Sequence, residues 1–298
     1  AVKLQTYSPE TITLNSRRPE FKIKDGLWKD FYLWDLYKKY QTPFKWHKEL
    51  FEFAKKNNII CFSSPFDETA VDLLEELNCP IYKLASFEIT HLPLIKKIAL
   101  TGKPLIISTG MASLKEVENA VKYAKKFGTK KIILLYCVSN YPSEIKDFNF
   151  KNIKILKDKF KCQIGFSDHS TNNLVAATAV ASGAEVIEKH IALRGQRNAP
   201  DIAFSTKGKD VRIYSNMLKE VYSMLGKNKS YDVKTDKKNI IYRRSIYSIK
   251  EIKKGEFFSK SNIKVVRPNK GLDPSRFFTL LSKKSKHSYK KNTPIKKN

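Results

Sequence analysis

The first 226 residues show a pattern of apolar and polar positions that is typical of an α/β protein. Short, nearly continuous apolar runs predict strands that are buried on both faces of a parallel sheet. Between these runs, apolar residues recur at helical spacing, as Trp46, Leu50, Phe53 and Ala54 do. The predicted strands cover residues 2–7, 59–64, 81–86, 105–109, 132–137, 163–167 and 186–191.

Seven strands, each followed by a helix, are one short of the eight in a closed (β/α)8 barrel. We expect a TIM barrel over residues 1–227 that lacks its first β/α unit in this sequence, because the chain starts inside a strand at Ala1. An open, doubly wound sheet is the alternative. The barrel is favoured because polar residues end nearly every strand, and a barrel gathers all these ends around one mouth.

The composition changes after the predicted barrel. Residues 228–239 are polar and predict a linker, and residues 240–298 have the strand and turn patterns of a small, mostly β domain. There is no run of about 18 apolar residues, no recognisable signal peptide and no CxxC pair among the four cysteines. We therefore expect a cytoplasmic protein with reduced thiols and no membrane association.

The formal net charge is +28, and more than half of this surplus lies after residue 228. A basic surplus can attract nucleic acid, anionic membranes or an anionic substrate. The basic tail lacks aromatic stacking platforms and any nucleic-acid-binding motif. We therefore interpret most of the lysine content as background and do not expect nucleic acid to be a partner.

Two histidines follow neighbouring predicted strands. His169 ends the motif Ser-Asp-His, His190 ends the motif Glu-Lys-His, and Asp201 follows. Parallel strands joined by a helix bring their carboxyl ends to one face of a sheet, so the two imidazoles can converge. Converging imidazoles suit a divalent metal ion, although each ring can also be satisfied separately by hydrogen bonds in the core.

Polar residues also end the other predicted strands. Lysine is costly inside a barrel unless it meets an anion, so Lys3 and Lys83 predict a ligand that carries phosphate or carboxylate. The competing interpretations are an exposed Lys3 and an ion pair of Lys83 with Glu88 or Glu188. The remaining strand-end residues are Gln5, Ser63, Ser64, Ser86, Thr109, Ser139, Tyr141 and Ser167.

The order and spacing of the strand-end motifs carry a family resemblance. The motifs are Lys-Leu-Gln at 3–5, Phe-Ser-Ser-Pro-Phe-Asp at 62–67, Tyr-Lys-Leu-Ala-Ser-Phe-Glu-Ile-Thr at 82–90, Ser-Thr-Gly-Met-Ala at 108–112, Ser-Asp-His at 167–169, Glu-Lys-His at 188–190 and Pro-Asp at 200–201. Together they resemble the sialic acid synthases, which condense phosphoenolpyruvate with an acylamino sugar to give a nine-carbon acidic sugar. The tail resembles the C-terminal antifreeze-like (SAF) domain of these enzymes, through Ile-Lys-Lys-Gly-Glu at 252–256 and Arg-Pro at 267–268.

Within this family the chain is most similar to the pseudaminic acid synthases, which use a 2,4-diacetamido-2,4,6-trideoxy sugar of the altrose series. N-acetylneuraminate and legionaminate synthases are the close alternatives. The resemblance implies that His169 and His190 bind a divalent cation such as Mn²⁺ or Mg²⁺, and that these histidines and Glu88 are catalytic. It also implies that Arg267 reaches the site of a neighbouring subunit, and hence a domain-swapped homodimer.

The resemblance also implies which residues bind the two substrates. Residues matching the phosphoenolpyruvate site are Lys3, Ser64, Lys83, Ser86, Ser139 and Ser167, and those matching the amino sugar site are Gln5, Glu88, Tyr141 and Asp201.

The sequence departs from the family pattern at two points. The family's first strand, with a glutamate that assists proton transfer, is absent from this sequence, so a non-catalytic binding protein is the alternative function. Tyr136 and Val138 stand close to Ser139, where relatives usually carry a basic residue and a threonine.

Overall fold

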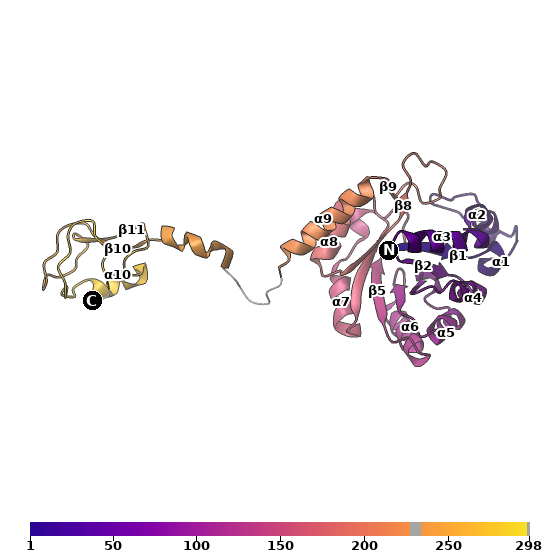
Figure 1. The fold of residues 1–298 in the computed structure, drawn as a ribbon, viewed down its shortest axis with the longest axis horizontal. Helices are drawn as coiled ribbons and strands as arrows, with labels where there is room; N and C mark the ends of the chain where they lie inside the picture. The colour runs from indigo at the N-terminus through magenta and orange to yellow at the C-terminus, as the bar shows by residue number, and fades with distance from the viewer. Residues whose placement is uncertain (227–233, 297–298) are drawn as a thin grey trace. The chain divides into compact units, whose positions relative to one another are not determined.

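The computed structural model describes residues 1–226 and 234–296, in two compact units, Ala1–Gly226 and Lys227–Asn298. The first unit is built on one parallel sheet, whose seven strands lie side by side in sequence order (Figure 1). The strands are β1 Val2–Thr6, β2 Cys61–Pro65, β3 Tyr82–Leu84, β4 Leu105–Ser108, β5 Ile132–Cys137, β6 Gln163–Asp168 and β7 Val186–Lys189. All seven predicted strands are thus confirmed, with ends that differ by a few residues.

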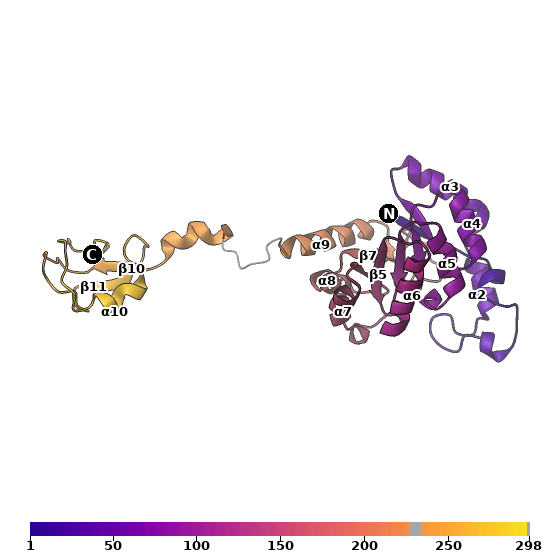
Figure 2. The same ribbon diagram turned by 90° about the horizontal axis from the view of Figure 1, so that it is seen from below.

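Helices connect these strands and cover the outer face of the sheet, as the two views in Figures 1 and 2 show. Side chains cap the first turns of α4, α6 and α8; Ser113 and Glu116, for example, form the capping box that begins α6. Two very short strands, β8 Ile191–Ala192 and β9 Thr206–Lys207, pair after β7. The helices are α1 Pro9–Ile12, α2 Leu33–Tyr40, α3 Phe44–Lys56, α4 Glu68–Glu76, α5 Leu92–Leu100, α6 Leu114–Lys126, α7 Lys151–Phe160, α8 Asn173–Ala181 and α9 Asp210–Met224.

The sheet curls until side chains from its first and last strands meet. Lys3 on β1 and Glu188 on β7 are in contact, although among the described residues β1 pairs only with β2 and β7 only with β6. The α/β fold with a curled parallel sheet is therefore confirmed, in the form of a half-barrel. The curl brings the carboxyl ends of all seven strands to one concave face.

Helix α3 differs from its predicted packing. The apolar stripe is present, but Trp46 is 53% exposed and Phe53 is 66% exposed, while His47 and Ala54 are buried. The helical spacing identifies an apolar face, but no described element covers most of this one.

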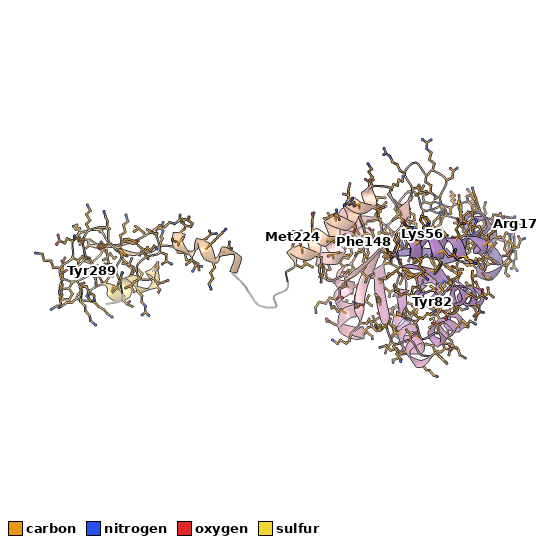
Figure 3. All side chains as sticks on the ribbon, viewed as in Figure 1. Arg17, Lys56, Tyr82, Phe148, Met224 and Tyr289 are labelled. Atoms are coloured by element: carbon orange, nitrogen blue, oxygen red, sulfur yellow. The ribbon has the colours of Figure 1, made fainter. Side chains whose placement is uncertain are left out.

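The second unit is small and has its own core. Strand β10 Ser245–Ser248 pairs with β11 Ile263–Val266 in antiparallel fashion, and α10 Phe277–Leu280 follows. Part of the predicted linker, residues 228–233, lies outside the described residues, and Lys234–Tyr242 forms a 3₁₀ helix. No helix in the described parts of the chain is long and apolar enough to cross a membrane. The core residues are Ile246, Ile252, Phe258, Ile263, Leu280, Tyr289 (labelled in Figure 3) and Ile295.

Candidate functional site

The carboxylate of Glu188 contacts side chains from three other strands of the sheet, β1, β3 and β6. Its Oε2 is 2.9 Å from Nζ of Lys3, and its Oε1 accepts a 2.8 Å hydrogen bond from Ser167 Oγ. Burial opposes ionisation of Glu188, but Lys3 and Lys83 outweigh burial and hold the pKa of this carboxyl below its usual range. Glu188 is therefore an internal anion that links the first strand to the last two.

Lys83 is almost completely enclosed, with 2% of its surface exposed. Its ammonium donates to the Leu84 carbonyl at 2.9 Å and lies 4.0 Å from Oε1 of Glu188. Burial lowers the pKa of Lys83 to about 8, while Glu188 acts in the opposite direction. Of the two carboxylates considered for Lys83, Glu188 is thus the one that forms an ion pair with it.

Two of the predicted serines come together around Gly110. The backbone N–H of Gly110 donates to Ser86 Oγ at 3.1 Å, and a Cβ at this position would lie 2.1 Å from Ser139 Oγ. The thiol of Cys137 contacts both serines, at 3.1 Å from Ser86 Oγ and 3.9 Å from Ser139 Oγ. Only glycine leaves space for this arrangement of hydroxyl groups.

Ser64 and Gln5 occupy adjacent positions on β2 and β1, where they are register partners. Ser64 Oγ is buried and has no hydrogen-bond partner in the described part of the chain. Buried hydroxyls are normally satisfied, so this free oxygen is suited to a ligand. Glu88, on the 3₁₀ turn Ser86–Glu88, likewise has a buried, unpartnered Oε2, and burial raises its pKa to about 7.

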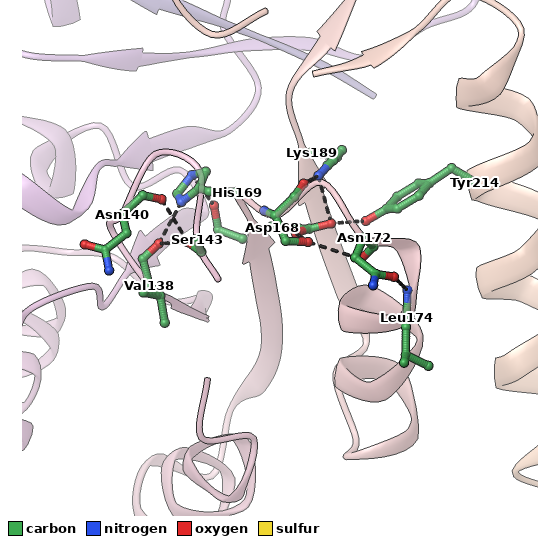
Figure 4. Close-up of polar contacts among 11 residues, drawn as sticks. Val138, Asn140, Ser143, Asp168, His169, Asn172, Leu174, Lys189 and Tyr214 are labelled. Atoms are coloured by element: carbon green, nitrogen blue, oxygen red, sulfur yellow. Dashed lines mark hydrogen bonds and ion pairs between the residues drawn. The ribbon is translucent and has the colours of Figure 1, made fainter. Parts of the chain in front are cut away.

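The two histidines converge as predicted, with ring centroids 5.5 Å apart. His169 Nδ1 lies 2.9 Å from the Val138 carbonyl (Figure 4), and His190 Nδ1 lies 3.1 Å from Asp201 Oδ2. A carbonyl can only accept a hydrogen bond, so Nδ1 of His169 carries the proton. The lone pair is then on Nε2, which lies 3.4 Å from Ser167 Oγ. Burial lowers the pKa of His169 to about 4, which keeps this imidazole neutral.

These donors fit a divalent metal ion. A metal-bound histidine typically uses one ring nitrogen for the ion and gives the other N–H to a carbonyl or carboxylate, as His169 and His190 do here. Among residues 1–226 and 234–296, no group of three or more His, Cys, Asp or Glu side chains could hold a metal. The protein would thus supply two imidazoles and leave the other coordination positions to substrate and water.

An aromatic wall stands beside the histidines. The Tyr141 ring lies 4.5 Å from the His169 ring, 5.4 Å from Phe204 and 5.5 Å from Trp28. The indole N–H of Trp28 donates to the Pro200 carbonyl at 3.3 Å, which ties the loop carrying Asp201 to this wall. Such a surface suits the apolar faces of a sugar ring.

The structure therefore brings most of the predicted site residues to one face and adds others. The contacts described above connect Lys3, Lys83, Ser167, His169, His190, Tyr141 and Asp201. Arg267 follows β11 in the second unit and is exposed, and its role remains a prediction. Five further residues were not predicted as site residues, namely Trp28, Gly110, Cys137, Glu188 and Phe204. Alternation along β7 could have revealed Glu188, because it shares a face with His190.

Comparisons with known proteins agree with this architecture. Residues 1–230 match the NeuB family. A pseudaminic acid synthase from Helicobacter pylori is 42% identical over 99% of this chain and 87% of its own length. An N,N'-diacetyllegionaminic acid synthase from Campylobacter jejuni is 37% identical over 99% of this chain and 89% of its own length. The crystal structure of N-acetylneuraminic acid (sialic acid) synthetase from Leptospira borgpetersenii, in complex with citrate, has a TM-score of 0.71 and 32% identity, over 80% of this chain and 79% of that one.

Fold and site together define an α/β half-barrel whose mouth is lined by lysine and histidine side chains. The family match covers most of the chain, and the relatives are aligned over nearly all of it. The chain belongs to the NeuB family.

Proposed function

We propose that this protein is a pseudaminic acid synthase. It condenses phosphoenolpyruvate with 2,4-diacetamido-2,4,6-trideoxy-altrose to give a nine-carbon nonulosonic acid and phosphate. The observation that carries the proposal is the pair of lysines around Glu188 beside two converging imidazoles. N-acetylneuraminate or legionaminate synthesis is the second candidate, and the legionaminic acid synthase relative is 37% identical against 42% for the pseudaminic acid synthase.

Phosphoenolpyruvate binds through the cationic and hydroxyl groups. Lys3 and Lys83 neutralise its phosphate and carboxylate, and both lysines already surround an anion in Glu188. The free hydroxyl of Ser64 supports an additional hydrogen bond to this ligand. The remaining donors in the proposed subsite are Ser86, Ser139 and Ser167.

His169 and His190 would hold the divalent cation, Mn²⁺, Mg²⁺ or a similar ion, through their Nε2 atoms. When bound, such an ion polarises the sugar aldehyde as a Lewis acid. The Val138 carbonyl and the Asp201 carboxylate fix the tautomer and direction of each ring. The new bond joins C3 of phosphoenolpyruvate to the aldehyde carbon, water adds at C2, and phosphate leaves.

The amino sugar lies against Tyr141 and contacts Gln5, Glu88 and Asp201. The pKa of Glu88 is near 7, so this carboxyl can accept or donate a proton at the operating pH, as a general acid or base must. The aromatic wall binds the apolar face of the sugar, and the polar groups bind its hydroxyl and amide groups.

The proposal extends to the second unit, as an antifreeze-like (SAF) domain over residues 240–298. In a domain-swapped homodimer, its Arg267 reaches the sugar in the site of the partner subunit. The exposed position of Arg267 directly after β11 supports this role. We also propose that the enzyme is cytoplasmic, as the sequence analysis predicts.

The proposal is tested by measuring phosphate release and nonulosonic acid formation from phosphoenolpyruvate and acylamino sugars of the altrose, gluco and manno series. We expect turnover with the altrose-series sugar, dependence on a divalent cation and loss of activity in His169→Ala. Unchanged activity of His169→Ala would contradict the proposed role of this histidine. A preference for another sugar series would contradict the proposed substrate. Phosphoenolpyruvate binding without any turnover would instead favour a non-catalytic binding protein.

A further inference from the structure

A second ion pair lies directly behind the two histidines. Asp168 and Lys189 immediately precede His169 and His190, and they are register partners on β6 and β7. Side chains alternate across a strand, so this pair lies on the face opposite to that of the imidazoles. The Lys189 ammonium is 3.0 Å from Asp168 Oδ2, with the two side chains 9% and 1% exposed.

The Asp168 carboxylate collects further donors around this pair (Figure 4). Tyr214, from helix α9, donates its hydroxyl to Oδ2 at 2.9 Å. Ser170 donates to Oδ1 with both its backbone N–H, at 2.9 Å, and its hydroxyl, at 2.7 Å. Lys189 also donates to the Ser170 carbonyl. The residues on both sides of His169 are therefore tied to each other and to β7.

The inner face of the same strand pair has a matching contact. Ser167 and Glu188, the preceding register partners, are joined by a hydrogen bond of 2.8 Å. The two strands are thus connected on both faces immediately before their histidines. The backbone after this point is also fixed, since the N–H of Ser143 donates to the His169 carbonyl at 3.1 Å. The imidazoles therefore have little freedom to move apart.

We propose that Asp168, Lys189 and Tyr214 are positioning residues that set the separation of His169 and His190, and with it the affinity for a divalent cation. This inference rests on the metal site of the proposed function. The three residues act through the strand pair, because Asp168 and Lys189 lie on the face opposite to that of the imidazoles. Groups that orient metal ligands typically change metal affinity by roughly tenfold to a hundredfold when they are removed.

The half-barrel contains a second triad of the same chemistry, which provides a matched control. Tyr82 donates its hydroxyl to Glu75 Oε1 at 2.6 Å, and Lys103 Nζ is 2.5 Å from the same oxygen. Tyr82 (labelled in Figure 3) begins β3, and Lys103 precedes β4, so this triad lies at the opposite end of the strands from the histidines. Its loss should affect folding without affecting the site.

The experiment measures Mn²⁺ binding to the chelator-treated full chain by titration calorimetry and by electron paramagnetic resonance. Tyr214→Phe and Lys189→Met are compared with Tyr82→Phe and Lys103→Met, and a thermal melt is recorded for each. We expect Lys189→Met to weaken Mn²⁺ binding by roughly tenfold or more, and Tyr214→Phe to weaken it less. The two control variants keep wild-type affinity while losing thermal stability, and Lys189→Arg recovers part of the affinity.

Unchanged Mn²⁺ affinity in Tyr214→Phe and Lys189→Met would overturn the inference, and so would an equal loss in the control triad. If Lys189→Met does not fold, the Mn²⁺ affinities of Tyr214→Phe and Tyr82→Phe alone test the inference, because each of these changes removes one hydroxyl group. A wild-type chain that binds no Mn²⁺ would refute the metal site of the proposed function, and this inference with it.

Discussion

Replacing Lys83 by methionine should stabilise the first unit while abolishing its activity. Burial lowers the pKa of Lys83 from 10.5 to about 8, against the attraction of Glu188. A pKa change of one is worth about 1.4 kcal/mol, so the charged ammonium costs about 3 kcal/mol in the folded protein at neutral pH. Methionine has a similar length and no charge, and Glu188 keeps Lys3 and Ser167 as partners. The free energy of unfolding should therefore rise by up to about 3 kcal/mol at pH 7.

The same shift determines how this gain depends on pH. Between about pH 8 and 10.5 the unfolded chain holds the Lys83 proton and the folded protein does not. Stability therefore rises with pH in this window, because the unfolded state binds more protons. The advantage of Lys83→Met over the wild type should be complete below pH 8 and should disappear as the pH approaches 10.5.

Urea denaturation followed by tryptophan fluorescence provides the measurement, since Trp28, Trp34 and Trp46 all belong to the first unit. Lys3→Met is the matched control. Lys3 is 21% exposed and is the closest cation to Glu188, so its loss should destabilise the protein instead. A Lys83→Met variant that is less stable than the wild type at pH 7, or whose gain is the same at every pH, would refute the reasoning.

Two further predictions concern the same face. In Gly110→Ala, the new methyl group would clash with Ser139 Oγ and Ser86 Oγ. We expect a loss of about 1–3 kcal/mol of stability and a higher KM for phosphoenolpyruvate in steady-state kinetics. An unchanged KM would argue against the serine subsite. Burial raises the Glu88 pKa from 4.5 to about 7, so in this range the folded state holds a proton that the unfolded state has lost. The contribution of Glu88 to wild-type stability therefore falls as the pH rises from 4.5 to about 7. This fall should be absent from urea titrations of Glu88→Gln. A fall that persists in this variant would assign the pH dependence to other groups.

The sequence was sufficient to predict the strands and the convergence of the histidines. Parallel strands are buried on both faces, so each appears as a continuous apolar run, and their common direction places His169 and His190 at one end. Lys83 and Ser167 were predicted to lie at strand ends, and in the structure both of them contact the carboxylate of Glu188.

Other parts of the site depend on contacts between distant segments. The sequence gives no distance between Asp201 and His190, which meet because a loop returns to the strand ends. The ion pair between Glu188 and Lys3 depends on the curl of the sheet, which brings side chains of β1 and β7 together. The apolar stripe of α3 illustrates a different limit, since periodicity identifies a face but not what covers it.

That exposed stripe affects how the protein behaves in solution. Trp46 and Phe53 form an exposed apolar surface that favours association between molecules. The net charge of +28 opposes this association through electrostatic repulsion. Repulsion is screened over about 10 Å at 0.1 M salt and about 3 Å at 1 M salt, whereas the apolar attraction is not weakened by salt. Light scattering should therefore show self-association that increases with ionic strength, and the protein should be purified and stored at low salt.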